Sequence, residues 1–178
     1  MGEVNRRWLL KERPVGMVGE HNFEWQEAPV PEPGEGEALV RVLYLSFDPA
    51  MRGWMQDRPS YIPPVAIGEP MRASSVGQVV RSNRDDLAPG DLVEGMSGWQ
   101  DYAIVGGGGM ASAATRLPAG IDPRHALGVL GLTGMTAYFG LLDLGKPKTD
   151  DVVLVSGAAG ATGSVAGQIA RIHGCRVI

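Results

Sequence analysis

The 178-residue sequence has a single cysteine and three histidines, so the side chains that hold most protein-bound zinc are nearly absent. Structural zinc sites take four Cys or His ligands, and catalytic sites take three protein ligands with one open position. Cys175 lies far from His21 and His125 in sequence, and His173 is isolated from both. The sequence therefore predicts no metal site. A lone cysteine also excludes an internal disulfide and is typical of a reducing compartment, which predicts a cytoplasmic protein.

A basic excess is also missing, since the formal net charge is −4. Proteins that bind nucleic acid usually carry a clustered positive patch, so no nucleic-acid partner is expected. The chain does not open with a basic segment followed by an apolar one, which argues against a secretory signal. Residues 126–142 carry no charge, but this run is slightly short for a membrane span and contains four glycines. It predicts a buried core helix, and no membrane partner.

Glycine, by contrast, is abundant, and one glycine-rich stretch has the context of a cofactor site. An apolar strand candidate at 152–155 precedes it, and a helix-like run at 165–173 follows, ended by Gly174. A second short apolar segment, 175–178, comes next. Strand, tight turn, helix and strand in this order predict the first unit of a dinucleotide-binding sheet.

The glycine spacing fits the chemistry of a dinucleotide. From Ala158 the pattern is A-x-G-x-x-G, with alanine where the stricter motif has its first glycine. A pyrophosphate must approach backbone N–H groups at a helix N-terminus, and a Cβ in the turn would hold it away. Gly160 is predicted to make that close approach, and Gly163 to let the helix pack on the strand. A phosphate-binding P-loop is excluded, because no Gly-Lys-Ser/Thr follows.

The chain before residue 120 is predicted to be mostly β-structure. Short apolar segments alternate with Gly/Pro turns, which favours a small, partly closed barrel. The strand candidates are 40–45, 75–80, 91–95 and 100–105. Asp48 before Pro49 predicts a capped helix start, and Asp122 before Pro123 predicts another. From there helix and strand patterns alternate, which places a domain boundary near residue 125.

Several segments together resemble one family. They are 45–53 (LSFDPAMRG), 98–102 (GWQDY), 127–142 (LGVLGLTGMTAYFGLL) and the glycine turn. In this order they are similar to the zinc-free medium-chain dehydrogenase/reductases of the leukotriene B4 12-hydroxydehydrogenase/prostaglandin reductase branch, which includes curcumin reductases and alkenal double-bond reductases. The resemblance implies a GroES-like, partly closed β-barrel domain over residues 1–125. It implies the first βαβ unit of a truncated Rossmann domain over 126–178.

The resemblance also implies an activity, a cofactor and site residues. Family members reduce the C=C bond of α,β-unsaturated ketones and aldehydes with NADPH, without a metal, and are commonly homodimers. The family's pyrophosphate turn falls on Gly160, Ala161, Thr162 and Gly163. Its threonine near the nicotinamide carboxamide matches Thr136, whose alternative role is a helix hydroxyl bonded back to a carbonyl.

The substrate side departs from the family pattern. Ala50 stands where members usually have a tyrosine after Asp-Pro, and Thr133 stands where they often have proline. Ala50, Met51 and Tyr61 are the candidate substrate-pocket residues, and Tyr61 is a candidate hydrogen-bond donor to a substrate carbonyl. No catalytic residue can be named from the sequence. A quinone reductase and a non-catalytic nucleotide-binding remnant are the alternative functions. Because the other Rossmann strands are missing, the isolated chain is expected to be inactive.

Overall fold

The computed structural model describes residues 3–108 and 112–178, which form two compact units divided between Gly120 and Ile121. The sequence placed the boundary five residues later, at 125/126. Each unit has its own secondary structure. Within the described residues, no helix combines the length and the apolar character needed to cross a membrane.

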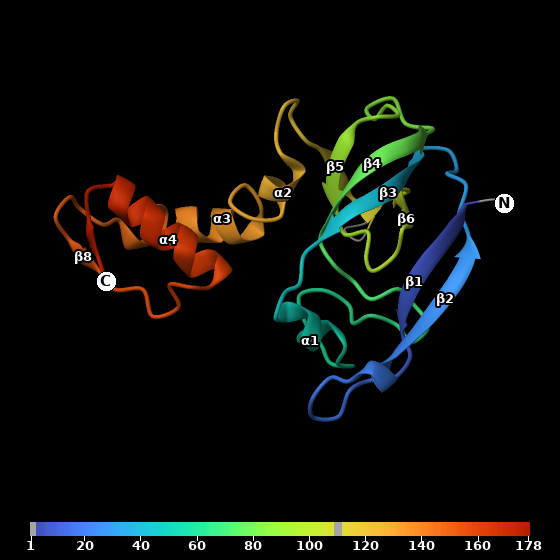
Figure 1. Ribbon diagram of the computed structural model, residues 1–178, viewed down its shortest axis with the longest axis horizontal. Coiled ribbons are helices and arrows are strands. Elements are labelled where there is room, and N and C mark those ends of the chain that lie inside the picture. The colour runs from blue at the N-terminus through green and yellow to red at the C-terminus, as the bar shows by residue number, and fades with distance from the viewer. Residues whose placement is uncertain (1–2, 109–111) are drawn as a thin grey trace. The chain divides into compact units, whose positions relative to one another are not determined.

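A five-stranded antiparallel sheet dominates the first unit. Its order is β6-β3-β4-β5-β7, and it curls into a half-barrel (Figure 1). The strands are β3 (Glu37–Leu45), β4 (Ser75–Ser82), β5 (Leu92–Gly95), β6 (Tyr102–Gly106) and β7 (Ala114–Arg116). Two irregularities in the β3–β4 register, at Leu39/Val40 and Val42/Tyr44, bend the sheet. The predicted partly closed GroES-like barrel is confirmed.

A second antiparallel pair joins β1 (Val4–Leu10) to β2 (Phe23–Pro29), with a short 3-10 turn, η1 (Glu20–Asn22), before β2. Asn5 ties this pair to β6. Its buried side-chain amide donates to the Tyr102 carbonyl at 2.9 Å and accepts from the Tyr102 N–H at 2.9 Å. One side chain thus makes both hydrogen bonds that a neighbouring strand residue would make.

The first unit has two groups of buried apolar side chains. One fills the half-barrel between its strands, and the other lies around the short helix α1 (Ala50–Trp54). The first group is Ala38, Val40, Val79, Leu87, Val93 and Val105. The second is Leu10, Met51, Trp54, Met55, Ile62, Val65, Met71 and Ala73. The α1 region is therefore held by its own core.

The predicted Asp48 cap of α1 is wrong. Pro49 occupies the N-cap position with helical dihedrals, and no side chain caps the helix. The Asp48 carboxylate instead accepts a hydrogen bond from the Ser46 hydroxyl at 2.5 Å. The Asp122 cap is confirmed, because its carboxylate accepts from the Arg124 N–H at the start of α2 (Pro123–Ala126).

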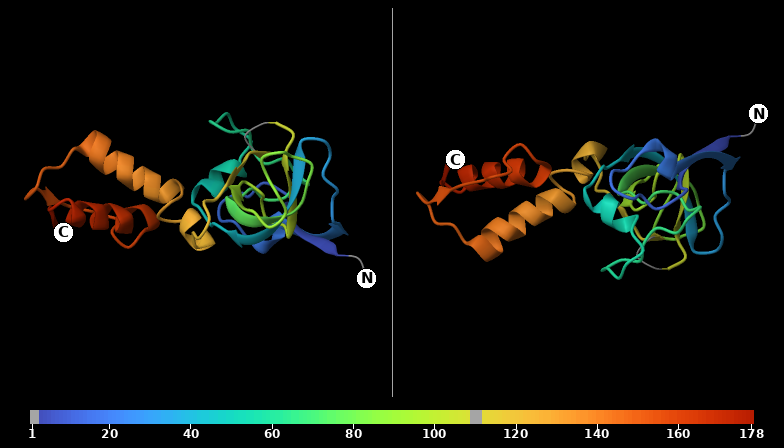
Figure 2. Two further views of the ribbon diagram at one scale, coloured as in Figure 1. Left: turned by 90° about the horizontal axis from the view of Figure 1, so that it is seen from above. Right: turned by 90° about the horizontal axis from the view of Figure 1, so that it is seen from below.

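The second unit contains α2, α3 (Leu132–Tyr138), the π-helical segment η3 (Phe139–Gly145), β8 (Val152–Val153), α4 (Ala161–Ile172) and β9 (Arg176–Val177). Strands β8 and β9 pair in parallel with α4 between them in sequence, which confirms the predicted first βαβ unit. Helices α3 and α4 lie side by side in both views of Figure 2.

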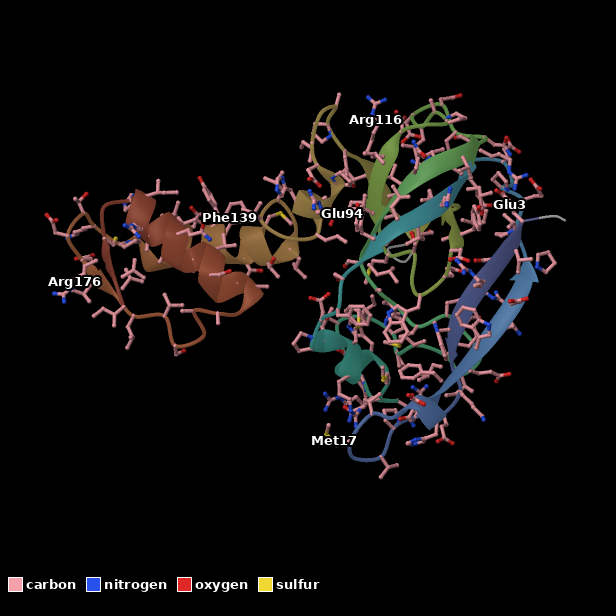
Figure 3. The ribbon with its side chains drawn as sticks, in the orientation of Figure 1. Glu3, Met17, Glu94, Arg116, Phe139 and Arg176 are labelled. Carbon is pink, nitrogen blue, oxygen red and sulfur yellow. The ribbon has the colours of Figure 1, made fainter. Side chains whose placement is uncertain are left out.

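The expectation of a buried core helix over 126–142 is only partly correct. The segment is helical in α3, but its large side chains are open to solvent: Leu132 is 65% exposed and Phe139 is 52% exposed. Figure 3 labels Phe139 where α3 passes into η3. The buried residues of α3 are small ones, Gly134 and Ala137, and the backbone of Val129 approaches Gly134 closely. An apolar composition therefore predicted the helix but not which residues it buries.

Candidate functional site

The glycine turn after β8 leads directly into α4. Gly160 is the N-cap residue, with extended dihedrals (φ −76°, ψ 164°), and its N–H donates to the Gly157 carbonyl at 2.9 Å. The first bond inside the helix runs from the Ser164 N–H to the Gly160 carbonyl. A tight turn thus leads into a twelve-residue helix whose first residue, Ala161, is exposed and whose next two are half-buried.

Three backbone N–H groups at this helix start are free. Among the described residues, the amides of Ala161, Thr162 and Gly163 have no hydrogen-bond acceptor. The turn around them is exposed, from Gly157 to Ala161. Free N–H groups together with the positive end of the helix dipole form a site for a phosphate group. The residues present therefore fit a dinucleotide pyrophosphate, and its binding at Gly160, Ala161, Thr162 and Gly163 stays a prediction.

The third glycine of the motif is required by close packing. A Cβ built on Gly163 would meet the Gly157 carbonyl oxygen at 2.1 Å, and one on Gly160 would meet the same oxygen at 3.2 Å. The sequence predicted that Gly163 lets the helix pack on the strand, and the contact that a side chain would block is with Gly157, in the turn that follows the strand. In both cases a side chain at 163 would push α4 away.

Thr136 lies on α3 with an exposed side chain. Its hydroxyl donates to the Leu132 carbonyl at 2.7 Å, which is the back-bonded arrangement weighed as its alternative role. A hydroxyl has one proton and two lone pairs, so the oxygen remains an acceptor for an amide N–H. A contact to a carboxamide stays a prediction.

The three substrate-side candidates differ sharply in exposure. Ala50 is exposed, Tyr61 is 77% exposed, and Met51 is only 5% exposed. Met51 belongs to the core around α1, so it supports the surface rather than forming it. Ala50 and Tyr61 are the two that a ligand can reach. A role for any of the three in substrate binding stays a prediction.

Two residues that the sequence did not single out form a group with Tyr61: Trp54, which contacts Tyr61, and Arg72, which contacts Trp54. The Trp54 indole N–H donates to the Tyr61 hydroxyl at 3.0 Å. The Arg72 guanidinium carbon lies 5.7 Å from the centroid of the Trp54 ring, within cation–π range. Arg72 also donates to the Pro63 carbonyl at 2.8 Å, and burial lowers the pKa of its guanidinium. A tryptophan seven residues before a tyrosine in a Pro-rich loop was the only sequence signal for this group.

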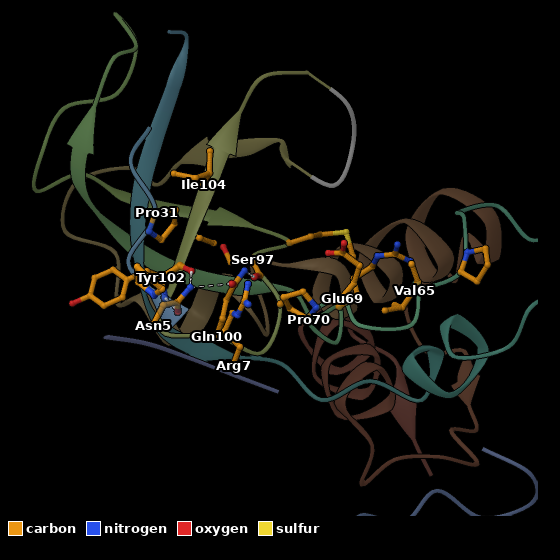
Figure 4. Close-up of a pocket in the computed structure, with 17 residues that line it drawn as sticks. Asn5, Arg7, Pro31, Val65, Glu69, Pro70, Ser97, Gln100, Tyr102 and Ile104 are labelled. Carbon is orange, nitrogen blue, oxygen red and sulfur yellow. Dashed lines mark hydrogen bonds between the residues drawn. The ribbon is translucent and has the colours of Figure 1, made fainter. Parts of the chain in front are cut away.

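Arg72 also lines a cavity of about 530 Å³ in the first unit. Figure 4 shows polar side chains entering it from β1 and from the segment before β6, including Arg7, Ser97 and Gln100. The Gln100 side-chain amide donates to the Ser97 carbonyl and accepts from Asn5. Among the described residues, no group of three or more His, Cys, Asp or Glu side chains could hold a metal ion.

Comparison with known proteins places these features in a family. The family model described as the N-terminal domain of oxidoreductase matches residues 6–112. The chain belongs to this family. The predicted resemblance to the prostaglandin reductase branch of the medium-chain dehydrogenase/reductases is confirmed.

The chain is 48% identical over 174 residues to the NADPH-dependent curcumin reductase of Escherichia coli (strain K12), covering 98% of this chain and 50% of that protein. It is 36% identical over 173 residues to prostaglandin reductase 1 of Mus musculus, covering 97% and 50%. Among solved structures, CurA of Vibrio vulnificus in complex with NADPH matches with a TM-score of 0.85 and 44% identity, covering 97% and 50%. The chain thus spans about half the length of the curated relatives it matches.

Proposed function

We propose that the full-length protein, meaning this chain extended to the length of its relatives, is an NADPH-dependent reductase of α,β-unsaturated ketones and aldehydes. The observation that carries the proposal is the set of three free N–H groups beside a glycine turn at the start of α4. The 48% identity to a curcumin reductase whose name states NADPH dependence supports the same cofactor. NADPH would supply the hydride that adds to the β-carbon of the substrate.

The residues of this chain would bind and orient the cofactor. The N–H groups of Ala161, Thr162 and Gly163 would bind the pyrophosphate. The Thr136 oxygen, with its proton already donated to Leu132, would accept from the carboxamide and orient the ring. Orientation matters because a correctly positioned donor and acceptor lower the entropic part of the barrier.

Tyr61 would act on the substrate oxygen. As hydride reaches the β-carbon, negative charge develops on the carbonyl oxygen, and a donor placed there stabilises the transition state. The Tyr61 oxygen accepts the Trp54 N–H, so its own proton remains available for donation. We further propose that the protein is a homodimer in the cytoplasm, where the buried thiol of Cys175 stays reduced.

A panel of enones, enals and quinones, each incubated with the full-length protein and NADPH, tests the proposal. We expect NADPH oxidation with conjugated ketones or aldehydes, and saturation of their C=C bond. Deuterium from NADPH labelled at the transferred position should appear at the β-carbon. Turnover confined to quinones would replace the proposal with a quinone reductase. Tight NADPH binding without turnover on any of them would favour a non-catalytic nucleotide-binding protein.

A further inference from the structure

The hydrogen bond between Trp54 and Tyr61 joins a buried group to an exposed one. Trp54 is 8% exposed, whereas Tyr61 is 77% exposed. An indole N–H can only donate, so in the 3.0 Å contact the Tyr61 oxygen is the acceptor. A buried indole N–H requires a partner, and here the partner is this phenol oxygen. The bond therefore leaves the hydroxyl proton of Tyr61 available for donation and fixes the position of the hydroxyl oxygen that carries it.

The loop that carries Tyr61 is anchored directly after the tyrosine. Ile62 and Val65 are 6% and 3% exposed and pack in the same core as Trp54. The Val65 N–H donates to the Trp54 carbonyl at 2.8 Å, which closes the loop onto the end of α1. Tyr61 directly precedes the first of these anchors and ends a stretch, residues 57–61, whose side chains are all exposed. The hydrogen bond from the indole restrains the tyrosine side chain at this place.

Arg72 adds a second restraint, over the face of the indole ring. Its guanidinium lies over the Trp54 ring and also holds the Pro63 carbonyl in the Tyr61 loop. A cation over an aromatic ring is attracted to its electron-rich face, which fixes the ring plane. Arg72 has no carboxylate partner among the described residues, so its charge is not neutralised by an ion pair. One arginine thus contacts both the Trp54 ring and the backbone of the loop that carries Tyr61.

We propose that Trp54 is a positioning residue for Tyr61: its N–H holds the phenol oxygen so that the phenol proton is presented to the substrate carbonyl. The inference rests on the proposed function, in which Tyr61 is the donor to the substrate oxygen. Ala50, the other exposed candidate, offers no hydroxyl for this role.

The hydrogen bond itself is tested by indole ¹⁵N–¹H NMR of the full-length protein. Trp54→Phe identifies the Trp54 resonance by removing it. In Tyr61→Phe that resonance should move upfield, because the N–H loses its acceptor, while the other tryptophan signals stay in place. An unmoved Trp54 resonance in Tyr61→Phe would overturn the inference, whatever the activity of the protein.

Kinetics then test the coupling. Tyr61→Phe should lower kcat on an enone by about tenfold to hundredfold, as expected for a hydrogen bond to a charged oxygen. Trp54→Phe should lower kcat by about threefold to tenfold, with the KM for NADPH unchanged. In the Tyr61→Phe background, Trp54→Phe should have almost no further effect. Trp25→Phe, the same change on the β1–β2 pair, is the matched control and should leave kcat unchanged.

If Trp54→Phe lowers kcat by the same factor with and without the Tyr61 hydroxyl, Trp54 acts independently of Tyr61. That result would overturn the inference and leave the proposed function intact. A wild-type protein that binds NADPH but reduces no enone would instead remove the proposed function, and the inference with it. The two failures are therefore distinguishable.

Discussion

Gly163 lies against the carbonyl group of Gly157, so closely that a Cβ at 163 would meet that oxygen at 2.1 Å. The clash is with backbone, which cannot rotate away as a side chain could. Gly163→Ala should therefore displace the start of α4 from the turn, and with it the three free N–H groups. We expect a loss of about 1–3 kcal/mol in stability, typical of overpacking, and weaker NADPH binding by at least about tenfold. Thermal unfolding measures the change in stability, and titration calorimetry measures the change in NADPH affinity.

Gly167, on the same helix, provides the control for this prediction. A Cβ there would meet only the Val177 side chain, at an ordinary 3.6 Å. Gly167→Ala should keep NADPH affinity and stabilise the helix by about 0.5–1 kcal/mol, since alanine is the better helix former. Equal losses of affinity in both variants would mean that helix composition, rather than the turn contact, governs binding.

The glycine turn could be predicted from sequence because its signals are local. Strand, glycine spacing and helix follow one another within about 25 residues, so the geometry is set by neighbours along the chain. The same holds for the Asp122 cap, where the acceptor and the N–H lie two residues apart. Asp48 has the same local pattern but a competing partner, the Ser46 hydroxyl, which the pattern did not reveal.

Contacts between distant residues could not be predicted in this way. Asn5 and Tyr102 are 97 residues apart in the sequence. No local pattern indicates that a single asparagine side chain makes the hydrogen bonds of a neighbouring strand. The Trp54–Tyr61–Arg72 group is closer in sequence, yet it depends on which way a Pro-rich loop folds back on α1. The exposure of Leu132 and Phe139 was also missed, because apolar composition does not say what covers a helix.

Asn5 provides a test of how the β1–β2 pair is held to the half-barrel. Asn5→Ala would leave both the N–H and the carbonyl of Tyr102 without their partner in a buried place. A buried polar group left unsatisfied costs about 1–3 kcal/mol, so two should cost about 2–6 kcal/mol in stability. Hydrogen exchange at the Tyr102 amide should accelerate with it. Asn83→Ala, which removes an exposed amide bonded to Pro33 and Gly34, should cost less than about 1 kcal/mol.

Glu94, on β5, predicts a pH dependence of stability (Figure 3). Burial raises the pKa of its carboxyl, so the folded state holds the proton more tightly than the unfolded state does. Stability is therefore greatest below the ordinary pKa of glutamate and falls as the pH rises through the raised pKa. Glu94→Gln should raise the melting temperature at neutral pH, on the order of 2 °C, and flatten this dependence.

Glu24 is an exposed glutamate on β2, and Glu24→Gln is the matched control for Glu94→Gln. It should leave the pH dependence of the melting temperature unchanged. A melting temperature that falls in Glu94→Gln at neutral pH would mean that the carboxylate makes a stabilising interaction that its burial alone does not describe.

The Asp122–Arg124 pair at the start of α2 predicts a pH dependence of stability opposite in sign to that of Glu94. Hydrogen bonds from the Arg124 guanidinium, and then from its backbone N–H, hold the pKa of the Asp122 carboxyl well below its usual range. The folded state thus binds the proton less tightly than the unfolded state does. The contribution of Asp122 to stability is therefore complete above the ordinary pKa of aspartate and is lost as the pH falls through the lowered pKa.

Arg124→Gln removes the guanidinium but keeps the backbone N–H that the cap requires. Carboxyl ¹³C NMR titration should show the Asp122 pKa rising only part of the way back, whereas Arg58→Gln should leave it in place. An Asp122 pKa that is unchanged in Arg124→Gln would assign the whole effect to the backbone cap, and raising the salt concentration should then have no influence on it.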